Sequence, residues 1–303
     1  MKRRDLLWIS TVAGLTAALP RDANAGTDTA PEPHPVPIHN PLRPPADGPI
    51  PVAFLLSDQA VVIDFAGPWE VFENVQRPGR DAPAFQLYTV AETLAPIQAS
   101  GGMTIVPTYS IATAPAPKLI VIPAQSDPSP AVLDWIRTAT RSTDITMSIC
   151  TGAFVLARTG LLSGKPATTH HGAFSELAMA FPDISIKRGA RFVDAGNISS
   201  SGGLSAGIDL ALHVVERYFG RAVALHTADM LEYQGQGWMN PDSNQAYAKR
   251  RVSTATHPLC PVCDMDIDRA MAPKSSYRGR TYYFCMLPHK TLFDADPARF
   301  LAG

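Results

Sequence analysis

The sequence predicts an α/β fold, a parallel sheet sandwiched by helices, followed by a small C-terminal metal-binding module. Two observations lead to the sheet: short apolar segments alternate with helical patterns, and several of these segments are apolar throughout. Strands of this kind are buried on both faces, as in parallel sheets covered by helices. A third observation is a cysteine-containing segment near the C-terminus, which is too short to build a large core of its own.

The first 25 residues have the pattern of a signal peptide. Arg3 and Arg4 precede an apolar segment, and the small-residue sequence "ANA" follows at 23–25. The alternative is a membrane anchor, but residues 6–19 are fewer than the ~20 that a spanning helix needs. The twin arginines indicate the export route for folded proteins, so we expect a periplasmic protein without a stable membrane span.

Composition and pattern divide the rest of the chain into four parts. Residues 26–49 contain eight prolines and almost no bulky apolar side chains, which is typical of an extended tether. The α/β domain follows at 50–235, a polar linker at 236–256 and the cysteine module at 257–303. With 303 residues, 17% charged and a formal charge of −1, the chain is long enough for one or two domains, and its charge does not suggest a nucleic-acid partner.

Within the α/β domain, apolar runs of strand length alternate with helical patterns. A further segment, 184–203, alternates and is punctuated by glycine, which predicts an antiparallel meander attached to the sheet. The expected strands are 50–56, 85–90, 118–124 and 145–149, and the expected helices are 67–75, 131–139, 152–158, 173–180 and 205–218.

Cys150 directly follows the predicted strand 145–149, and ligands of open α/β sheets bind at the carboxyl ends of the strands. A helix that starts after the cysteine would place the thiol at a helix N-terminus, which favours a thiolate. Gly152 would permit the sharp turn, and the amides of Thr151 and Gly152 could stabilise a developing negative charge. The alternative is a buried cysteine that packs as a small apolar side chain.

Asp64 follows the first strand and could face the same crevice as an acid or base. Its alternative role is a helix N-cap, which aspartate often fills. Gly67 and Pro68 predict a helix that starts later, which leaves Asp64 too early in the chain to be that cap. We therefore expect a functional role for this carboxylate.

The C-terminal module contains Cys260 and Cys263 in a C-x-x-C pattern, followed by Cys285 and His289. Three thiolates and an imidazole can form a tetrahedral site for one zinc or copper ion. The alternative is a disulfide in an oxidising compartment, which would leave one thiol unpaired. Loading of the metal before export as a folded protein would favour the metal site.

Four segments of the α/β domain resemble the PfpI/ThiJ superfamily, which has the class I glutamine amidotransferase-like, flavodoxin-like fold. They are "IDFAGPWEVF", "SGGMTIVP", "SICTGAFVLARTGLLSGKPATTHH" and "GNISSSGGLSAGIDLALHVVERYFG". The resemblance is strongest to the branch that includes isonitrile hydratase and the amidase-like domains of certain transcriptional regulators.

This resemblance implies roles for individual residues. Cys150 would be the nucleophile, Asp64 its acid/base partner and Thr151 a further catalytic residue, with no cofactor at this site. Gly102, Gly152 and His170 would line the substrate pocket or the oxyanion site, although His170 could equally be a structural histidine. In contrast to proteolytic relatives, Thr151 replaces the histidine that follows the cysteine, and His171 stands where relatives often have tryptophan.

The segment "CPVCDMDID…YRGRTYYFCMLPHKTLFDADPARFL" resembles the YHS domain, a small metal-binding module. This sequence departs from the YHS pattern at His289, where many members have the second cysteine of the later pair. Met265 could add a soft ligand for Cu(I), although a packing role is the simpler interpretation.

The sequence therefore predicts an exported enzyme that hydrates or hydrolyses a small carbon–nitrogen substrate through a thioimidate on Cys150, with a metal-binding accessory module. The alternative is a non-catalytic metal or redox sensor or carrier, whose α/β domain only binds a ligand. We expect a small-molecule substrate and a metal ion as partners, no nucleic acid, and a homodimer as one possible assembly.

Overall fold

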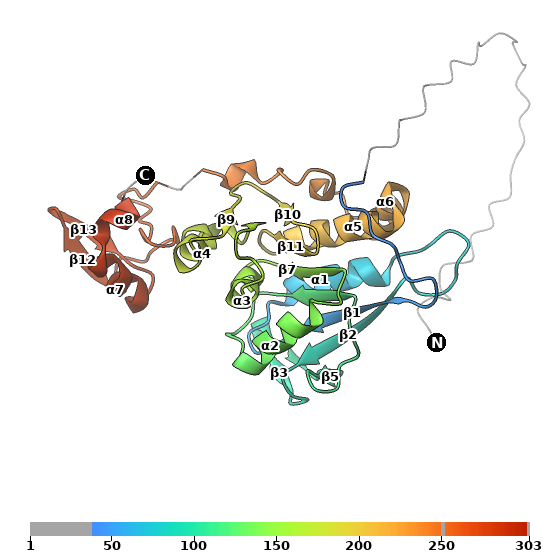
Figure 1. Ribbon diagram of the computed structural model, residues 1–303. Coiled ribbons are helices and arrows are strands. Elements are labelled where there is room, and N and C mark those ends of the chain that lie inside the picture. The colour runs from blue at the N-terminus through green and yellow to red at the C-terminus, as the bar shows by residue number, and fades with distance from the viewer. Residues whose placement is uncertain (1–37, 250–251, 302–303) are drawn as a thin grey trace, which may run out of the picture. The chain divides into compact units, whose positions relative to one another are not determined.

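The computed structural model of the protein describes residues 38–249 and 252–301 (Figure 1). The predicted signal peptide and the first part of the predicted tether, to residue 37, lie outside the described residues. Among the described residues, no helix is both long enough and apolar enough to cross a membrane.

The α/β domain is built on a seven-stranded sheet with the strand order β10-β11-β7-β6-β1-β2-β5. All neighbouring strands pair in parallel except β10, which is antiparallel to β11 at one edge. The predicted fold class is therefore confirmed. The strands are β1 (Ile50–Leu55), β2 (Phe85–Ala91), β5 (Tyr109–Ser110), β6 (Leu119–Ile122), β7 (Ile145–Ser148), β10 (Phe192–Asp194) and β11 (Ile198–Ser201).

Helices cover both faces of this sheet, as the apolar strands require (Figure 1). Side chains alternate between two cores: Val52 and Phe54 pack with α1 and α5, whereas Ala53 and Leu55 pack with α2 and α3. The helices are α1 (Val62–Glu73), α2 (Pro130–Ala139), α3 (Gly152–Arg158), α4 (Phe174–Ala180), α5 (Ala206–Phe219) and α6 (Arg221–Met230). Two short strand pairs lie outside the main sheet, β3 (Ile97–Gln98) with β4 (Thr104–Ile105) and β8 (Pro166–Ala167) with β9 (Ser185–Ile186).

Two local predictions differ from the structure. Helix α1 begins at Val62, five residues before the predicted start, because the Ser100 hydroxyl accepts the Val62 N–H and Pro68 is tolerated inside the helix. Asp64 therefore lies in the first turn of α1 rather than ahead of the helix. The predicted meander is only partly antiparallel, since β11 joins the main sheet by pairing in parallel with β7.

The C-terminal module consists of an antiparallel hairpin and two short helices. It has its own apolar core, in which Phe284 and Phe293 are fully buried. The hairpin is formed by β12 (Lys274–Tyr277) and β13 (Arg280–Tyr283), and the helices are α7 (Leu287–Ala295) and α8 (Pro297–Leu301).

Both segments that flank the α/β domain make specific contacts with it. In the predicted tether, Leu42 donates its N–H to the carbonyl of Arg217, whose guanidinium donates to the carbonyl of Asn40. In the segment that follows α6, Trp238 is only 2% exposed and packs in the core beneath α5. Residues near both predicted domain boundaries therefore contribute to the packing of the domain.

Candidate functional site

Cys150 lies in the tight turn between β7 and α3. Its φ angle is 56°, in the left-handed region that residues other than glycine rarely adopt. The surrounding chain holds this conformation, because the Cys150 N–H donates to the Gly202 carbonyl at 3.0 Å and the Thr169 hydroxyl donates to the Cys150 carbonyl at 2.8 Å. A strained and fixed backbone at a buried thiol is typical of functional sites.

Gly152 is required by close packing at the start of α3. A Cβ atom there would lie 2.2 Å from the carbonyl oxygen of Ile122, the last residue of the neighbouring strand β6. The Gly152 N–H donates to the Ile149 carbonyl at 2.9 Å, so this amide is engaged within the turn. The glycine thus allows the turn to fit against β6. Its N–H is not free to stabilise a negative charge on the sulfur, whereas the N–H groups of Thr151 and Leu204 contact the thiol.

The Cys150 thiol is in an environment that favours its protonated form. Its pKa is raised to about 11, first by burial and then by the nearby charge of Asp64, although the N–H groups of Thr151 and Leu204 and the Thr151 hydroxyl oppose the rise. The expectation of a thiolate favoured by the helix N-terminus is therefore wrong, because desolvation and a like charge outweigh the donors. Attack by this sulfur requires that its proton be removed.

Asp64 provides a group that can accept this proton. The residue is fully buried, and its Oδ2 accepts the N–H of Ala124 at 3.0 Å. Oδ1 is buried and has no hydrogen-bond partner among the described residues. Burial raises the pKa of the carboxyl group to about 6, and the hydrogen bond from Ala124 opposes this rise.

The structure therefore brings together three of the predicted site residues: Asp64, Cys150 and Thr151. The influence of the Asp64 charge on the thiol and the donation from Thr151 both require proximity to Cys150. A thiol with a raised pKa and a carboxylate with an unused oxygen can exchange one proton. Such a pair can perform nucleophilic attack coupled to acid–base catalysis.

His170 and Gly102 occupy different surroundings. The ring of His170 packs against Gly203, next to the residues that contact Cys150, and its Nδ1 accepts the Gly172 N–H at 3.2 Å. Burial and the neighbouring His171 lower its pKa, so the ring is neutral at neutral pH. Gly102 lies in the exposed turn between β3 and β4, with a φ of 81°.

The sequence did not predict three contacts of Cys150, with Thr169, Gly202 and Leu204. The Thr169 hydroxyl binds the Cys150 carbonyl, and the Leu204 N–H donates to the thiol. Leu204 has a φ of 51° and follows the pair Gly202 and Gly203. The consecutive glycines before a helix are a sequence signal for a tight turn, but they do not reveal which strand end that turn contacts.

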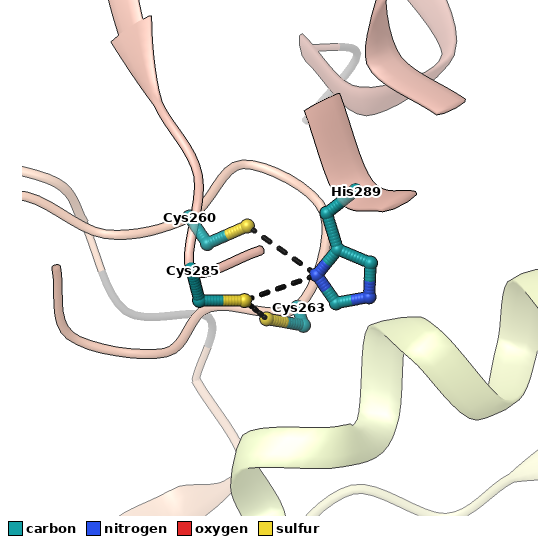
Figure 2. Close-up of side chains that lie close together, drawn as sticks. All are labelled: Cys260, Cys263, Cys285 and His289. Carbon is teal, nitrogen blue, oxygen red and sulfur yellow. Dashed lines mark hydrogen bonds between the residues drawn. The ribbon is translucent and has the colours of Figure 1, made fainter. Parts of the chain in front are cut away.

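The second site is the cysteine and histidine cluster of the C-terminal module (Figure 2). Cys260 and Cys263 lie in a tight turn, Cys285 follows β13, and His289 is in the first turns of α7. Their ligand atoms all lie within 4.8 Å of one another, and Figure 2 shows the four side chains pointing toward a common centre. All four predicted ligands are therefore brought together.

The donor set and its spacing fit a metal ion. His289 Nδ1 is 3.1 Å from the sulfur of Cys285 and 3.7 Å from that of Cys260, and the sulfurs of Cys263 and Cys285 are 3.5 Å apart. A zinc–sulfur bond of about 2.3 Å gives tetrahedral edges of about 3.8 Å, close to these values. The four side chains could therefore hold one metal ion.

Electrostatics within the cluster also favour a metal site. Hydrogen bonds from Cys263 and His289 lower the pKa of Cys260, and the hydrogen bond with Cys260 is the largest effect that raises the pKa of His289. Two buried thiols, the half-buried thiol of Cys285 and the His289 imidazole thus compete for the same protons. A cation at their centre would relieve this competition, because metal ligands bind in their deprotonated forms.

A sequence model of the DJ-1/PfpI family matches residues 51–217, which include Asp64, Cys150 and Thr151. The chain belongs to the DJ-1/PfpI family. Over 187 residues it is 33% identical to isonitrile hydratase of Pseudomonas putida, a match that covers 60% of this chain and 78% of that enzyme. It is also 26% identical over 188 residues to the HTH-type transcriptional regulator GbdR of Pseudomonas aeruginosa, of which it covers 50%.

Solved structures of the DJ-1/PfpI family agree with this assignment. A crystal structure of a ThiJ/PfpI family protein from Pseudomonas syringae superposes with a TM-score of 0.56 and 27% sequence identity. The match covers 68% of this chain and 84% of that protein. Drosophila melanogaster DJ-1beta, at 19% identity and a TM-score of 0.54, shares the fold.

Proposed function

We propose that the protein is a cysteine-dependent hydratase that converts a small isonitrile into an N-substituted formamide. The observation that carries this proposal is the buried Asp64 carboxylate, whose Oδ1 has no partner among the described residues, close to the Cys150 thiol. The similarity to isonitrile hydratase of Pseudomonas putida supports the choice of substrate class.

In the first step, the Cys150 sulfur attacks the terminal carbon of the isonitrile. Asp64 accepts the thiol proton and then delivers it to the same carbon, which gives a thioimidate in which carbon is bonded to sulfur, hydrogen and nitrogen. The isonitrile adds to the thiol in full and nothing leaves. A carboxyl pKa of about 6 suits this relay, because the group can both accept and release a proton near neutral pH.

In the second step, water attacks the thioimidate carbon. Asp64 takes a proton from the water, the nitrogen gains a proton, and the carbon–sulfur bond breaks to release the formamide and restore the thiol. The hydroxyl of Thr151, which lies against the Cys150 sulfur, would orient the water or the carboxyl group. The whole cycle consumes one isonitrile and one water and requires no redox change.

Removal of the sulfur is the direct test. Cys150→Ala should lower the hydration rate of an alkyl isonitrile by at least about 10³-fold, the scale on which catalytic nucleophiles act. The metal content of the protein should not change, because the C-terminal cluster is built from other residues. Turnover by Cys150→Ala at the wild-type rate, or no hydration of isonitriles by the wild-type protein, would refute the proposal.

For the C-terminal module, we propose a YHS-type domain that holds one zinc or copper ion. Cys260, Cys263, Cys285 and His289 would be the ligands, and their thiolate-rich set suits both metals. The ion would fix the short hairpin and helices of a module with a small core. The cluster also supports a second candidate function, a metal or redox carrier in which Cys150 is silent.

We also propose that the protein is exported to the periplasm by the twin-arginine route. The support is the arginine pair Arg3-Arg4, the short apolar segment behind it and the small residues at 23–25. Export after folding would allow the cluster to acquire its metal first. Fractionation of cells before and after Arg3→Lys and Arg4→Lys substitution tests this route, and an unchanged periplasmic fraction would contradict it.

A further inference from the structure

The segment that follows α6 makes a series of contacts near the Cys150 turn. We call residues 237–248 the capping segment; it lies outside the part of the chain that the family model matches. The Arg191 N–H donates to the Pro241 carbonyl at 2.6 Å, and the Asn244 N–H donates to the Gly189 carbonyl at 2.9 Å. Together with the buried Trp238, these bonds fix the capping segment to the loop that precedes β10.

The turn Gly202–Leu204 holds Cys150 from two sides. The Gly202 carbonyl accepts the Cys150 N–H at 3.0 Å, and the Leu204 N–H donates to the Cys150 sulfur. Gly203 lies between these two contacts. A shift of this turn would therefore change both the strained backbone of Cys150 and the hydrogen bond that stabilises its thiolate.

A column of three rings connects the capping segment to this turn. The Tyr247 ring stacks on His171 with centroids 4.5 Å apart and an interplanar angle of 23°, and His171 lies 4.2 Å from His170. The His170 ring packs so closely on Gly203 that a Cβ atom there would lie 2.2 Å from His170 Cδ2.

The capping segment also contacts the turn directly. The side-chain nitrogen of Asn244, Nδ2, would lie 2.9 Å from a Cβ atom on Gly202. Nδ2 also donates to the Ala190 carbonyl, and Oδ1 of the same side chain accepts from the Arg191 guanidinium. Both glycines of the turn therefore pack against side chains that the capping segment supplies or supports.

We infer that the capping segment is a positioning element for the nucleophile, in which Tyr247 acts through His171 and His170 to hold the Gly202–Leu204 turn against Cys150. The capping segment thus tunes the reactivity of a thiol that lies in a part of the chain shared with the family. This inference rests on Cys150 as the reacting thiol, as proposed above, and not on the identity of the substrate.

Alkylation of Cys150 by iodoacetamide at a series of pH values tests the inference in the full, metal-loaded chain. Mass spectrometry of the Cys150 peptide separates this thiol from the other three cysteines. Tyr247→Ala should slow alkylation about 3- to 10-fold at a fixed pH below the thiol pKa, which is the scale of one weakened hydrogen bond. The midpoint of the pH profile should move upward, because a weaker hydrogen-bond donor stabilises the thiolate less and so raises the pKa of the thiol.

Three further variants separate positioning from stability. Tyr247→Phe keeps the stacked ring and should retain the wild-type profile, whereas Tyr109→Ala removes a tyrosine from the opposite edge strand β5 and should lower thermal stability without moving the profile. His171→Leu interrupts the column without altering the capping segment and should reproduce Tyr247→Ala if that variant folds poorly. An unchanged pH midpoint in folded Tyr247→Ala or His171→Leu would overturn the inference, as would an equal shift in Tyr109→Ala. These outcomes do not depend on isonitrile turnover, so they remain informative if the proposed hydration fails.

Discussion

The chain uses buried cysteines in two regions, and their neighbours give them different chemistry. In the α/β domain, a single thiol lies near one carboxylate, and burial with a like charge keeps it protonated. In the C-terminal module, three thiols converge on an imidazole, and mutual hydrogen bonds lower the pKa of Cys260. One region is suited to proton transfer and covalent chemistry, and the other to holding a cation.

The two regions also differ in how the backbone presents the cysteines. Cys150 is held in a left-handed conformation in a turn that Gly152 fits against β6. The four metal-ligand candidates come from a turn, the end of a strand and a helix, and so connect separate elements of a small module. The comparison predicts that each region can be disabled without affecting the chemistry of the other.

The largest expected effect is the loss of metal from the C-terminal cluster. Cys260→Ala removes one of four ligands, and structural zinc sites of this type contribute on the order of 10 kcal/mol to folding. We expect metal content to fall to background and the module to lose its thermal transition, while isonitrile hydration per α/β domain stays within about twofold of the wild-type rate. Met271→Ala, which truncates an exposed side chain of the same module, is the matched control and should retain the metal. A parallel loss of hydration in Cys260→Ala would break the proposed independence of the two regions.

A smaller effect is expected for the carboxylate. Asp64→Asn removes the proton acceptor and should lower the hydration rate by about 10²- to 10⁴-fold, the usual contribution of acid–base catalysis. Because the like charge is also lost, the pKa of Cys150 should fall and its alkylation should become faster. Asp58→Asn, an exposed carboxylate after β1, should change neither rate. If Asp64→Asn slowed both reactions, or neither, the assigned role of Asp64 would be wrong.

The smallest expected effect is the pH dependence of hydration, which depends on Asp64 in the α/β domain and not on the metal cluster. The pKa of Asp64 is raised to about 6, and the carboxylate must be ionised to accept the thiol proton. Catalytic efficiency should therefore fall as the pH decreases through about 6, by about tenfold per pH unit once the carboxyl group is protonated. Metal content and hydration rate should be measured together at each pH, so that loss of the metal in acid is distinguished from protonation of Asp64. An efficiency that stays constant between about pH 7 and pH 5 would contradict the proton relay.

Much of the fold followed from the apolar pattern of the sequence. The segments that form β1 and β6 are continuous apolar runs, and their burial on both faces is a direct consequence of a parallel sheet covered by helices. The start of α1 differs from the prediction because Gly67 and Pro68 are typical helix-start residues, whereas the Ser100 hydroxyl that accepts the Val62 N–H is distant in sequence.

The site was predictable where the chemistry depends on short spacing. Cys260 and Cys263 form one closely spaced pair in the sequence, and Cys285 and His289 form another. Such spacings are typical of metal ligands, so the sequence alone indicates the cluster. The raised pKa of Cys150 was not predictable, because it depends on burial and on the position of Asp64 across the sheet. The contacts of Leu204 with Cys150 and of Tyr247 with His171 were likewise not predictable, because each joins residues more than 50 positions apart in the sequence.

The central claim is that the Cys150 sulfur forms a bond with the isonitrile carbon during turnover. Mass spectrometry of acid-quenched reaction mixtures tests this most directly, because the thioimidate adds the full mass of the isonitrile to one peptide. The account predicts this adduct on the Cys150 peptide within the first turnover, and its absence in Cys150→Ala. Formation of the formamide without such an adduct, or with the adduct on Cys260, Cys263 or Cys285 instead, would contradict it.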